Sequence, residues 1–238
     1  MKKICFVMPQ MYPLLSGFKD NKIIGGSEMQ VDRIADTLDK KKYEICFIVN
    51  EKGDDEILNG KKIVKFSGNN HISIYLSFIK AFIRADADTY YQRIGGMITG
   101  FCGILSKICK KKFIHAVAWD RQCEKNNFSL LRHISYNIGI KSADVVISQS
   151  EYQKELLKKN FNRKSIVIKS IYVIKTKEKP QKKNFILWGS TIDKTKQPDL
   201  FLRLAEQLPE YKFIMFGGKR MNEESTYSKI KQKAKKIK

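Results

Sequence analysis

The sequence lacks the cysteine and histidine patterns that build disulfide scaffolds and zinc sites. Its five cysteines are odd in number and scattered along the chain, and no two of them form a CxxC pair. No cluster of cysteine and histidine has the spacing of metal ligands. The simplest interpretation is that the cysteines are reduced thiols of a cytosolic protein, and we expect no bound metal.

Long apolar runs are also missing. Residues 4–8 are apolar but stop at Pro9, which is too short for the hydrophobic region of a signal peptide. The longest weakly polar stretch, residues 94–106, is rich in glycine and too short to span a bilayer. The sequence therefore predicts a soluble chain in the cytoplasm.

Acidic residues are scarce beside basic ones. The chain has 24 Asp and Glu against 46 Lys and Arg, a formal net charge of +22. Such a charge favours an anionic partner, which could be nucleic acid, an anionic membrane surface or a phosphorylated substrate. There is no helix-turn-helix, zinc-finger or RNA-recognition signature, and aromatic residues do not alternate with basic ones. We therefore expect no nucleic-acid partner, and that class remains the alternative that the charge supports.

Short apolar strand patterns alternate with helical periodicity from residue 1 to about residue 170. Between the first two strand patterns, Val31, Ile34, Ala35 and Leu38 recur at the spacing of one helix face. Strand patterns occur at residues 4–8, 45–49, 63–66, 89–92, 113–118, 145–148 and 166–169. This alternation predicts a doubly wound α/β domain with a parallel sheet over residues 1–174, whose ligands bind outside the carboxyl ends of the strands.

A hydrophilic segment, residues 175–184, separates this domain from a second α/β series and is predicted to be a linker. The second series has strand patterns at residues 185–188 and 213–216, with an apolar helical stripe over residues 201–208 between them. A doubly wound domain has about five or six strands. We therefore expect residues 185–238 to form an incomplete second Rossmann-like domain.

The loop after the first strand contains a glycine pair at the start of a helix, Gly25-Gly26-Ser27-Glu28. Glycines there let a ligand approach free backbone N–H groups, and the helix dipole favours an anion. We expect Ser27 to cap the helix, with Gln30 completing a capping box. Gly25, Gly26 and Glu28 are thus candidate binding residues for a phosphate or a sugar hydroxyl, unless the glycines only form a turn that starts the helix.

Two further candidates follow later strands. Asp120 could orient an acceptor hydroxyl or act as the catalytic base, or it could be a turn residue paired with Arg121. Arg93 follows the strand at residues 89–92 and could bind an anionic group, or it could form a surface ion pair.

In the second series, candidate donor-binding residues follow both strand patterns. Ser190 follows the first of these strands, and Gly217 and Gly218 follow the second. Lys196 stands just before a helix, where a lysine suits a diphosphate and would neutralise charge on a leaving nucleotide. The alternative for Lys196 is an exposed side chain in a lysine-rich protein.

Taken together, several segments resemble the retaining glycosyltransferases of family 4. The most specific segment runs from residues 186–190 through 196–201 to 213–218, and is similar to the opening of that family's donor domain in order, spacing and residue type. Three shorter segments add to the resemblance, at residues 25–28, 87–93 and 143–153.

The resemblance implies the GT-B fold, in which an acceptor domain and a donor domain face a cleft. It implies transfer of a sugar from a nucleotide-diphosphate sugar to an acceptor hydroxyl, with retention at the anomeric carbon and without metal or other cofactor. By position, Gly25 and Gly26 would lie near the donor phosphates and the acceptor, and Lys196 would hold the diphosphate.

The sequence departs from the family pattern in two places. Ser190 and Thr191 stand where the family usually has a Gly-Arg pair, and the family's paired-glutamate motif would fall beyond Lys238. We therefore expect a donor domain truncated before its complete site, and no catalysis by this chain alone.

The predicted function is sugar transfer in the synthesis of a cell-surface polysaccharide or glycolipid. The predicted partners are the nucleotide-sugar donor, a glycan or lipid-linked acceptor and, from the basic charge, the anionic inner face of a membrane. The alternatives are a basic nucleic-acid-binding protein and an assembly subunit whose open sheet edge pairs with another chain.

Overall fold

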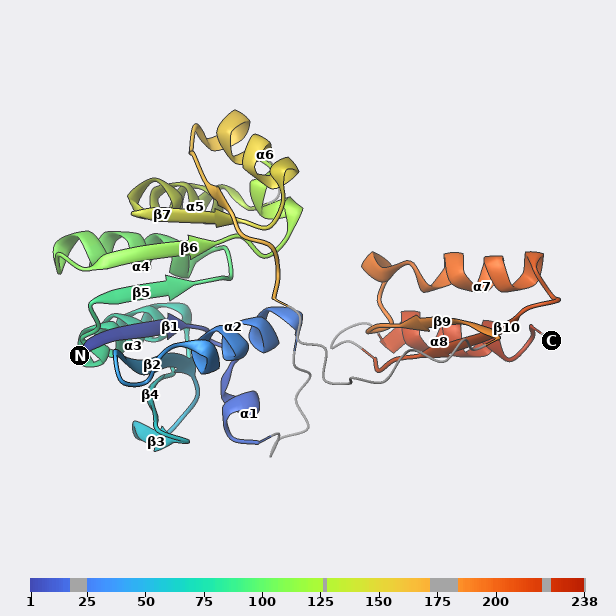
Figure 1. The fold of residues 1–238 in the computed structure, drawn as a ribbon, viewed down its shortest axis with the longest axis horizontal. Helices are drawn as coiled ribbons and strands as arrows, with labels where there is room; N and C mark the ends of the chain where they lie inside the picture. The colour runs from blue at the N-terminus through green and yellow to red at the C-terminus, as the bar shows by residue number, and fades with distance from the viewer. Residues whose placement is uncertain (18–24, 126–127, 172–183, 220–223, 238) are drawn as a thin grey trace. The chain divides into compact units, whose positions relative to one another are not determined.

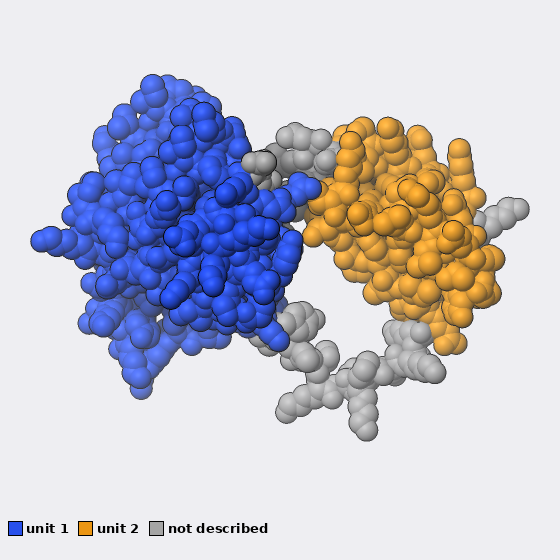
Figure 2. All heavy atoms as spheres, turned by 90° about the horizontal axis from the view of Figure 1, so that it is seen from above, with its two compact units in different colours: residues 1–173 blue, residues 174–238 orange. Residues whose placement is uncertain are grey.

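The computed structural model describes residues 1–17, 25–125, 128–171, 184–219 and 224–237. The chain divides into two compact units, residues 1–173 and residues 174–238, shown in blue and orange in Figure 2. Of the predicted linker, residues 175–183 lie outside the described ranges.

Unit 1 is built on an eight-stranded sheet with the order β3-β4-β2-β1-β5-β6-β7-β8. All neighbouring strands are parallel except β3, which pairs antiparallel with β4. The strands are β1 (Lys2–Val7), β2 (Tyr43–Asn50), β3 (Glu56–Leu58), β4 (Lys61–Phe66), β5 (Thr89–Gln92), β6 (Lys112–Ala116), β7 (Val145–Ser148) and β8 (Ile166–Val167). The chain adds β2 and β4 on one side of β1 and then returns to place β5 on its other side, so the order of the strands reverses between β1 and β5. The predicted doubly wound α/β fold is confirmed.

Helices cover both faces of this sheet (Figure 1). One core cluster packs α1 (Tyr12–Leu15) and α2 (Gly26–Thr37) against one face of β1 and β2. A second cluster packs the other face against α3 (His71–Ala85), α4 (Met97–Ile108), α5 (Leu130–Ser142) and α6 (Glu151–Phe161). The central strands are therefore buried on both sides, which explains their nearly continuous apolar sequences.

Local signals in the sequence start several of these helices. Asn70 and Ser73 form a reciprocal capping box at the start of α3. Ser150 caps α6 by accepting a hydrogen bond from the Gln153 backbone N–H at 3.2 Å. The expectation for α2 is wrong: the N-cap residue is Gly25, and the Ser27 hydroxyl caps no backbone group.

Unit 2 contains β9 (Phe185–Gly189) and β10 (Lys212–Phe216), which pair in parallel. Its helices are the short η2 (Lys194–Lys196), α7 (Pro198–Gln207) and α8 (Glu224–Ala234). Pro198 occupies the first helical position of α7, where its missing N–H costs nothing. Three buried side chains, Ile192, Leu202 and Ile230, form the centre of its small core.

Within the described ranges, no helix is both long enough and apolar enough to cross a membrane.

Candidate functional site

The carboxyl edge of the unit 1 sheet opens into a cavity of about 690 Å³. Its lining comes from the ends of β2, β4 and β5, from Pro9 after β1, and from the first turns of α3, α4 and α5. The lining residues are Pro9, Asn50, Phe66, His71, Ile74, Tyr75, Gln92, Ile94, Gly95, Gly96, Met97, Ile98, Ser129, Leu131 and Arg132. The cavity therefore lies where the order of the strands reverses, which is the expected place for a ligand site in such folds.

The cavity combines apolar walls with positive electrostatic potential. Among the described residues that line it there is no Asp or Glu. The N-termini of three helices face it, and each carries the partial positive charge of a helix dipole. The Arg132 guanidinium adds a full charge and lies over the start of α4, where it donates a hydrogen bond to the Gly95 carbonyl at 3.2 Å. Such a lining suits an anionic group attached to an apolar body.

A buried polar network supports the floor of the cavity at Gln92. The Gln92 Oε1 atom lies 2.7 Å from His115 Nδ1, and the Thr99 hydroxyl lies 3.3 Å from the same oxygen. His115 Nε2 lies 3.3 Å from the Tyr136 hydroxyl. The network thus joins β5, β6, α4 and α5 behind the cavity.

The geometry of this network indicates the protonation state of His115. An amide oxygen can only accept a hydrogen bond, so Nδ1 carries the proton and Nε2 accepts from Tyr136. Complete burial, and then the charge of Arg93, lower the pKa of His115 to about 3. His115 is therefore a neutral packing residue at physiological pH, as its place in a strand suggests.

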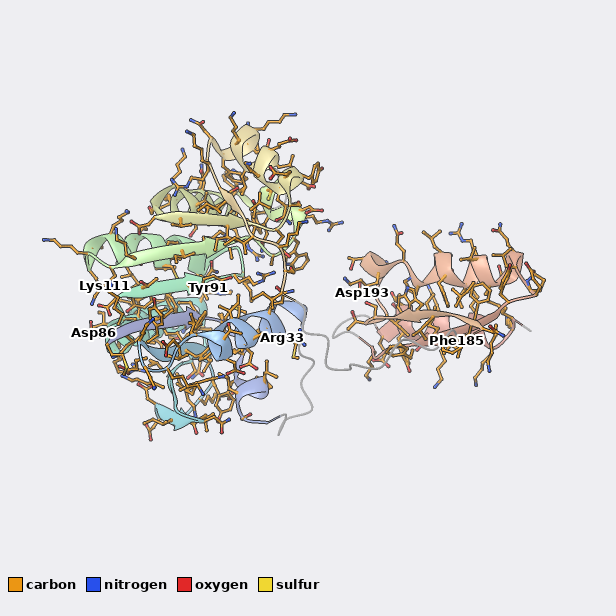
Figure 3. All side chains as sticks on the ribbon, in the orientation of Figure 1. Arg33, Asp86, Tyr91, Lys111, Phe185 and Asp193 are labelled. Carbon is orange, nitrogen blue, oxygen red and sulfur yellow. The ribbon has the colours of Figure 1, made fainter. Side chains whose placement is uncertain are left out.

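Arg93 follows β5 and is buried, with only 6% of its surface exposed. Its Nε atom has no hydrogen-bond partner among the described residues. Burial raises the pKa of the neighbouring Tyr91, and the charge of Arg93 and a hydrogen bond from it act against that increase. Among the described residues, Arg93 therefore does not form a surface ion pair, which was the alternative to an anion site. Tyr91 is labelled in Figure 3.

The glycine pair at the start of α2 is exposed, whereas Glu28 is only 4% exposed. The Ser27 hydroxyl donates a hydrogen bond to Glu28 Oε2 at 2.7 Å. A Cβ atom at Gly25 would lie 2.7 Å from that same oxygen, so glycine permits this close approach. The backbone N–H groups of the first turn keep no side-chain cap, and a ligand could still reach them.

Asp120 begins the short helix η1 (Asp120–Cys123) after β6 and is exposed. Its Oδ1 atom accepts a hydrogen bond from the Gln153 side chain at 2.9 Å. Gln153 in turn accepts from the Gln149 backbone N–H at 2.8 Å. Asp120 is therefore held at the carboxyl edge by α6, with one carboxylate oxygen directed to its neighbour.

In unit 2, Ser190, Gly217 and Gly218 lie together where β9 and β10 continue beyond the sheet. A Cβ atom at Gly217 would lie 1.8 Å from the Ser190 carbonyl oxygen, so only glycine fits there. The Ile192 backbone N–H donates to the Gly218 carbonyl at 2.9 Å. These residues therefore align two backbone segments at the carboxyl ends of the strands.

Lys196 ends η2, immediately before the N-cap of α7, and its side chain is exposed. The preceding loop is fixed by Asp193, which is 1% exposed and lies at the far end of β9 from Phe185 (Figure 3). Asp193 accepts hydrogen bonds from the Thr195 backbone N–H at 2.8 Å and from the Thr191 hydroxyl at 3.1 Å. Asp193 was not predicted from the sequence, although an aspartate two residues before a threonine is a recognisable turn signal.

The structure brings some of the predicted residues together and adds others. Ser190 and Gly217 are in direct contact, whereas none of Asp120, Arg93 and Glu28 lines the cavity. The cavity residues His71, Gln92 and Arg132 were not singled out, because positions so far apart give no sequence signal of their proximity. Over the described part of the chain, no group of three or more His, Cys, Asp or Glu could hold a metal ion.

Comparison with known proteins yields structural likeness only. No protein-family model and no curated protein matches the sequence. A complex of S. aureus MnaA with UDP superposes with a TM-score of 0.60 at 14% identity, covering 100% of this chain and 66% of that chain. A Listeria monocytogenes protein assigned as a UDP-N-acetylglucosamine 2-epimerase gives 0.58 at 12% identity, with 100% and 66% covered. The UDP-GlcNAc 2-epimerase of Methanocaldococcus jannaschii gives 0.56 at 10%, with 98% and 70% covered.

This chain therefore spans about two thirds of the length of the structures it resembles. At such low identity the likeness establishes the α/β fold alone. None of the three is named as a glycosyltransferase, so the comparisons do not support the resemblance to family 4 beyond this fold.

Proposed function

We propose that this chain is part of a cytoplasmic enzyme that moves a sugar from a nucleotide-diphosphate sugar to an amphipathic, anionic acceptor. The observation that carries the proposal is the unit 1 cavity, which joins apolar walls to three helix N-termini and Arg132 without any carboxylate among its described lining residues. A lipid carrying a phosphate or diphosphate has the matching chemistry, because its chain is apolar and its head group is anionic.

Unit 2 is the proposed donor-binding part. Lys196 beside the N-terminus of α7 offers a cation to a diphosphate, and the dipole of the helix adds partial positive charge there. Gly217 and Gly218 offer exposed backbone near the end of β10, and the half-buried Ser190 lies beside them. The names of the similar structures, one a UDP complex and two assigned to UDP-GlcNAc epimerases, support a nucleotide-sugar substrate for this chain.

The remaining predicted residues take supporting roles in the proposal. Asp120, held by Gln153, is the proposed base or orienting group for the acceptor hydroxyl. The first turn of α2 at Gly25 and Gly26, and the partly unpaired guanidinium of Arg93, are the proposed contacts for further anionic groups.

The cavity proposal is tested by calorimetric titration with decyl phosphate, decanol and inorganic phosphate. We expect decyl phosphate to bind at least about tenfold more tightly than either part alone, because one hydrogen bond to a charged group contributes about 1.5–3 kcal/mol. Arg132→Gln should weaken decyl phosphate by about tenfold. The matched control is Arg84→Gln, since Arg84 lies outside the cavity and pairs with Asp55. Equal binding of decanol and decyl phosphate would contradict the proposal.

A second candidate function, epimerisation of a nucleotide sugar, is favoured by the names of two similar structures. Such a reaction needs no acceptor, so an apolar cavity would have no substrate to hold. Proton NMR of UDP-N-acetylglucosamine incubated with the chain alone separates the two: a second sugar-nucleotide epimer in the absence of any acceptor would favour epimerisation over transfer.

A further inference from the structure

Large apolar side chains are exposed on the outer side of helices that cover one face of the unit 1 sheet. On α3, Ile72, Leu76 and Ile83 are exposed, and Ile72 is 73% exposed. On α4, Ile104 and Ile108 are exposed, the latter 70%. The opposite sides of both helices carry residues of the buried core, so these five side chains point away from the sheet.

Helix α5 continues this apolar surface. Leu130, Ile134 and Ile138 follow one another at four-residue spacing, and all three are exposed, as is Leu131. Helix α5 packs closely along α4, because glycines of both helices face each other at the crossing. The exposed residues of α3, α4 and α5, here called the α3–α5 face, therefore form one side of unit 1. Exposed apolar groups of this number mark an interaction surface.

The charges on the α3–α5 face have one sign. The sequences of α3, α4 and α5 contain no Asp or Glu, whereas they contain five Lys and Arg. Arg84 and Lys107 are ion-paired with aspartates from neighbouring loops. The positive charge of the face therefore comes mainly from Lys80, Arg132 and Lys141.

We infer that the α3–α5 face binds the surface of an anionic lipid bilayer. Isoleucine and leucine side chains would enter the boundary between head groups and acyl chains, and the basic side chains would contact anionic head groups. A second copy of this chain fits less well, because a symmetric contact would bring a face without acidic residues against itself. An anionic bilayer supplies the opposite charge that the face lacks.

This placement gives the cavity a source of substrate, a consequence that rests on the proposed function. Leu131 is 73% exposed on the face and also lines the cavity, as does the neighbouring Arg132. The cavity would thus open at the bilayer surface. A lipid-borne acceptor could enter it without leaving the membrane.

The inference is tested by co-sedimentation of the full chain with vesicles of phosphatidylcholine, with and without phosphatidylglycerol, and with no nucleotide present. The wild type should bind the anionic vesicles. Lys80→Gln and Lys141→Gln should each weaken this binding about fivefold, because that is the contribution of one basic residue near an anionic surface. The double variant Ile104→Glu with Ile108→Glu should bind about tenfold less.

The matched control is Ile57→Glu with Ile166→Glu, because these isoleucines are exposed on β3 and β8, outside the α3–α5 face. This control should bind like the wild type, and circular dichroism melts check that both double variants remain folded. Equal binding to neutral vesicles, or equal loss in the control, overturns the inference. A dimer in solution that Ile104→Glu with Ile108→Glu dissociates, without vesicle binding, assigns the face to a second copy instead. Nucleotide binding, measured separately, can fail without altering these results.

Discussion

At the scale of single residues, the polar groups buried at the carboxyl edge of the sheet link the stability of the protein to pH. His115 is completely buried and hydrogen-bonded to Gln92 and Tyr136, and burial, followed by the charge of Arg93, keeps it neutral. A buried network of this kind is stable only while every member keeps its partner. Protonation of His115 would place a second charge near Arg93 and remove the acceptor that Tyr136 uses.

This network predicts a loss of stability in mild acid. The pKa of His115 is about 3 in the folded chain against an ordinary value of 6.5. Below pH 6.5 the unfolded chain binds a proton that the folded chain does not, so stability is full above pH 6.5 and decreases as the pH falls toward 3. We expect His115 to lower the free energy of unfolding by about 2 kcal/mol between pH 7 and pH 5.

Urea unfolding of the wild type and His115→Gln at both pH values measures this effect. The variant should lose most of the pH dependence, whatever its stability at pH 7. His71→Gln, at an exposed position, is the matched control and should keep it. The same pH dependence in wild type and His115→Gln would show that the histidine is not buried as described.

At the scale of elements, the contact between α4 and α5 positions two walls of the cavity. Gly100, Gly103 and Gly139 let the two helices approach at backbone distance. A Cβ atom at Gly139 would lie 2.3 Å from the Thr99 carbonyl oxygen and 2.8 Å from the Gly100 nitrogen. Because these are backbone atoms, the helices would have to separate to accept even one methyl group.

Gly139→Ala is therefore expected to destabilise the chain by about 2–3 kcal/mol. The control is Gly26→Ala, since Gly26 also lies in a helix but a Cβ atom there meets nothing within 4 Å. That control should change stability by less than about 1 kcal/mol. Thermal unfolding followed by circular dichroism compares the two, and a neutral Gly139→Ala would refute the close crossing.

The elements also show what sequence can predict. Strands such as β5 and β7 match their predicted ranges, because apolar segments between turns and amphipathic helices carry a local signal. The short α1 and β3 were missed, since four and three residues are too few to set a periodicity. The cavity could not be predicted, because His71, Gln92 and Arg132 meet only through the strand order. The predicted cap at Ser27 is wrong because the Ser27 hydroxyl donates its hydrogen bond to Glu28 instead of capping the helix.

At the scale of the whole molecule, the basic residues behind the net charge of +22 differ in their surroundings. Many lysines pair with nearby carboxylates, such as Lys61 with Asp32 and Asp36. Among the basic residues of unit 1, Arg132 lines the cavity, and Lys80 and Lys141 lie on the α3–α5 face. The proposed partners of these charges are phosphate-bearing small molecules and lipid head groups, not nucleic acid.

The central claim is that the chain binds a nucleotide diphosphate through unit 2, and calorimetric titration with UDP tests it most directly. We expect UDP to bind, and Lys196→Ala to weaken it by about tenfold, because a charge-assisted hydrogen bond contributes about 1.5–3 kcal/mol. The control is Lys212→Ala, because Lys212 is also exposed but lies at the end of β10 away from Gly217, and this variant should bind UDP like the wild type. Absence of binding by UDP and by other nucleoside diphosphates, or equal loss in both variants, would contradict the account.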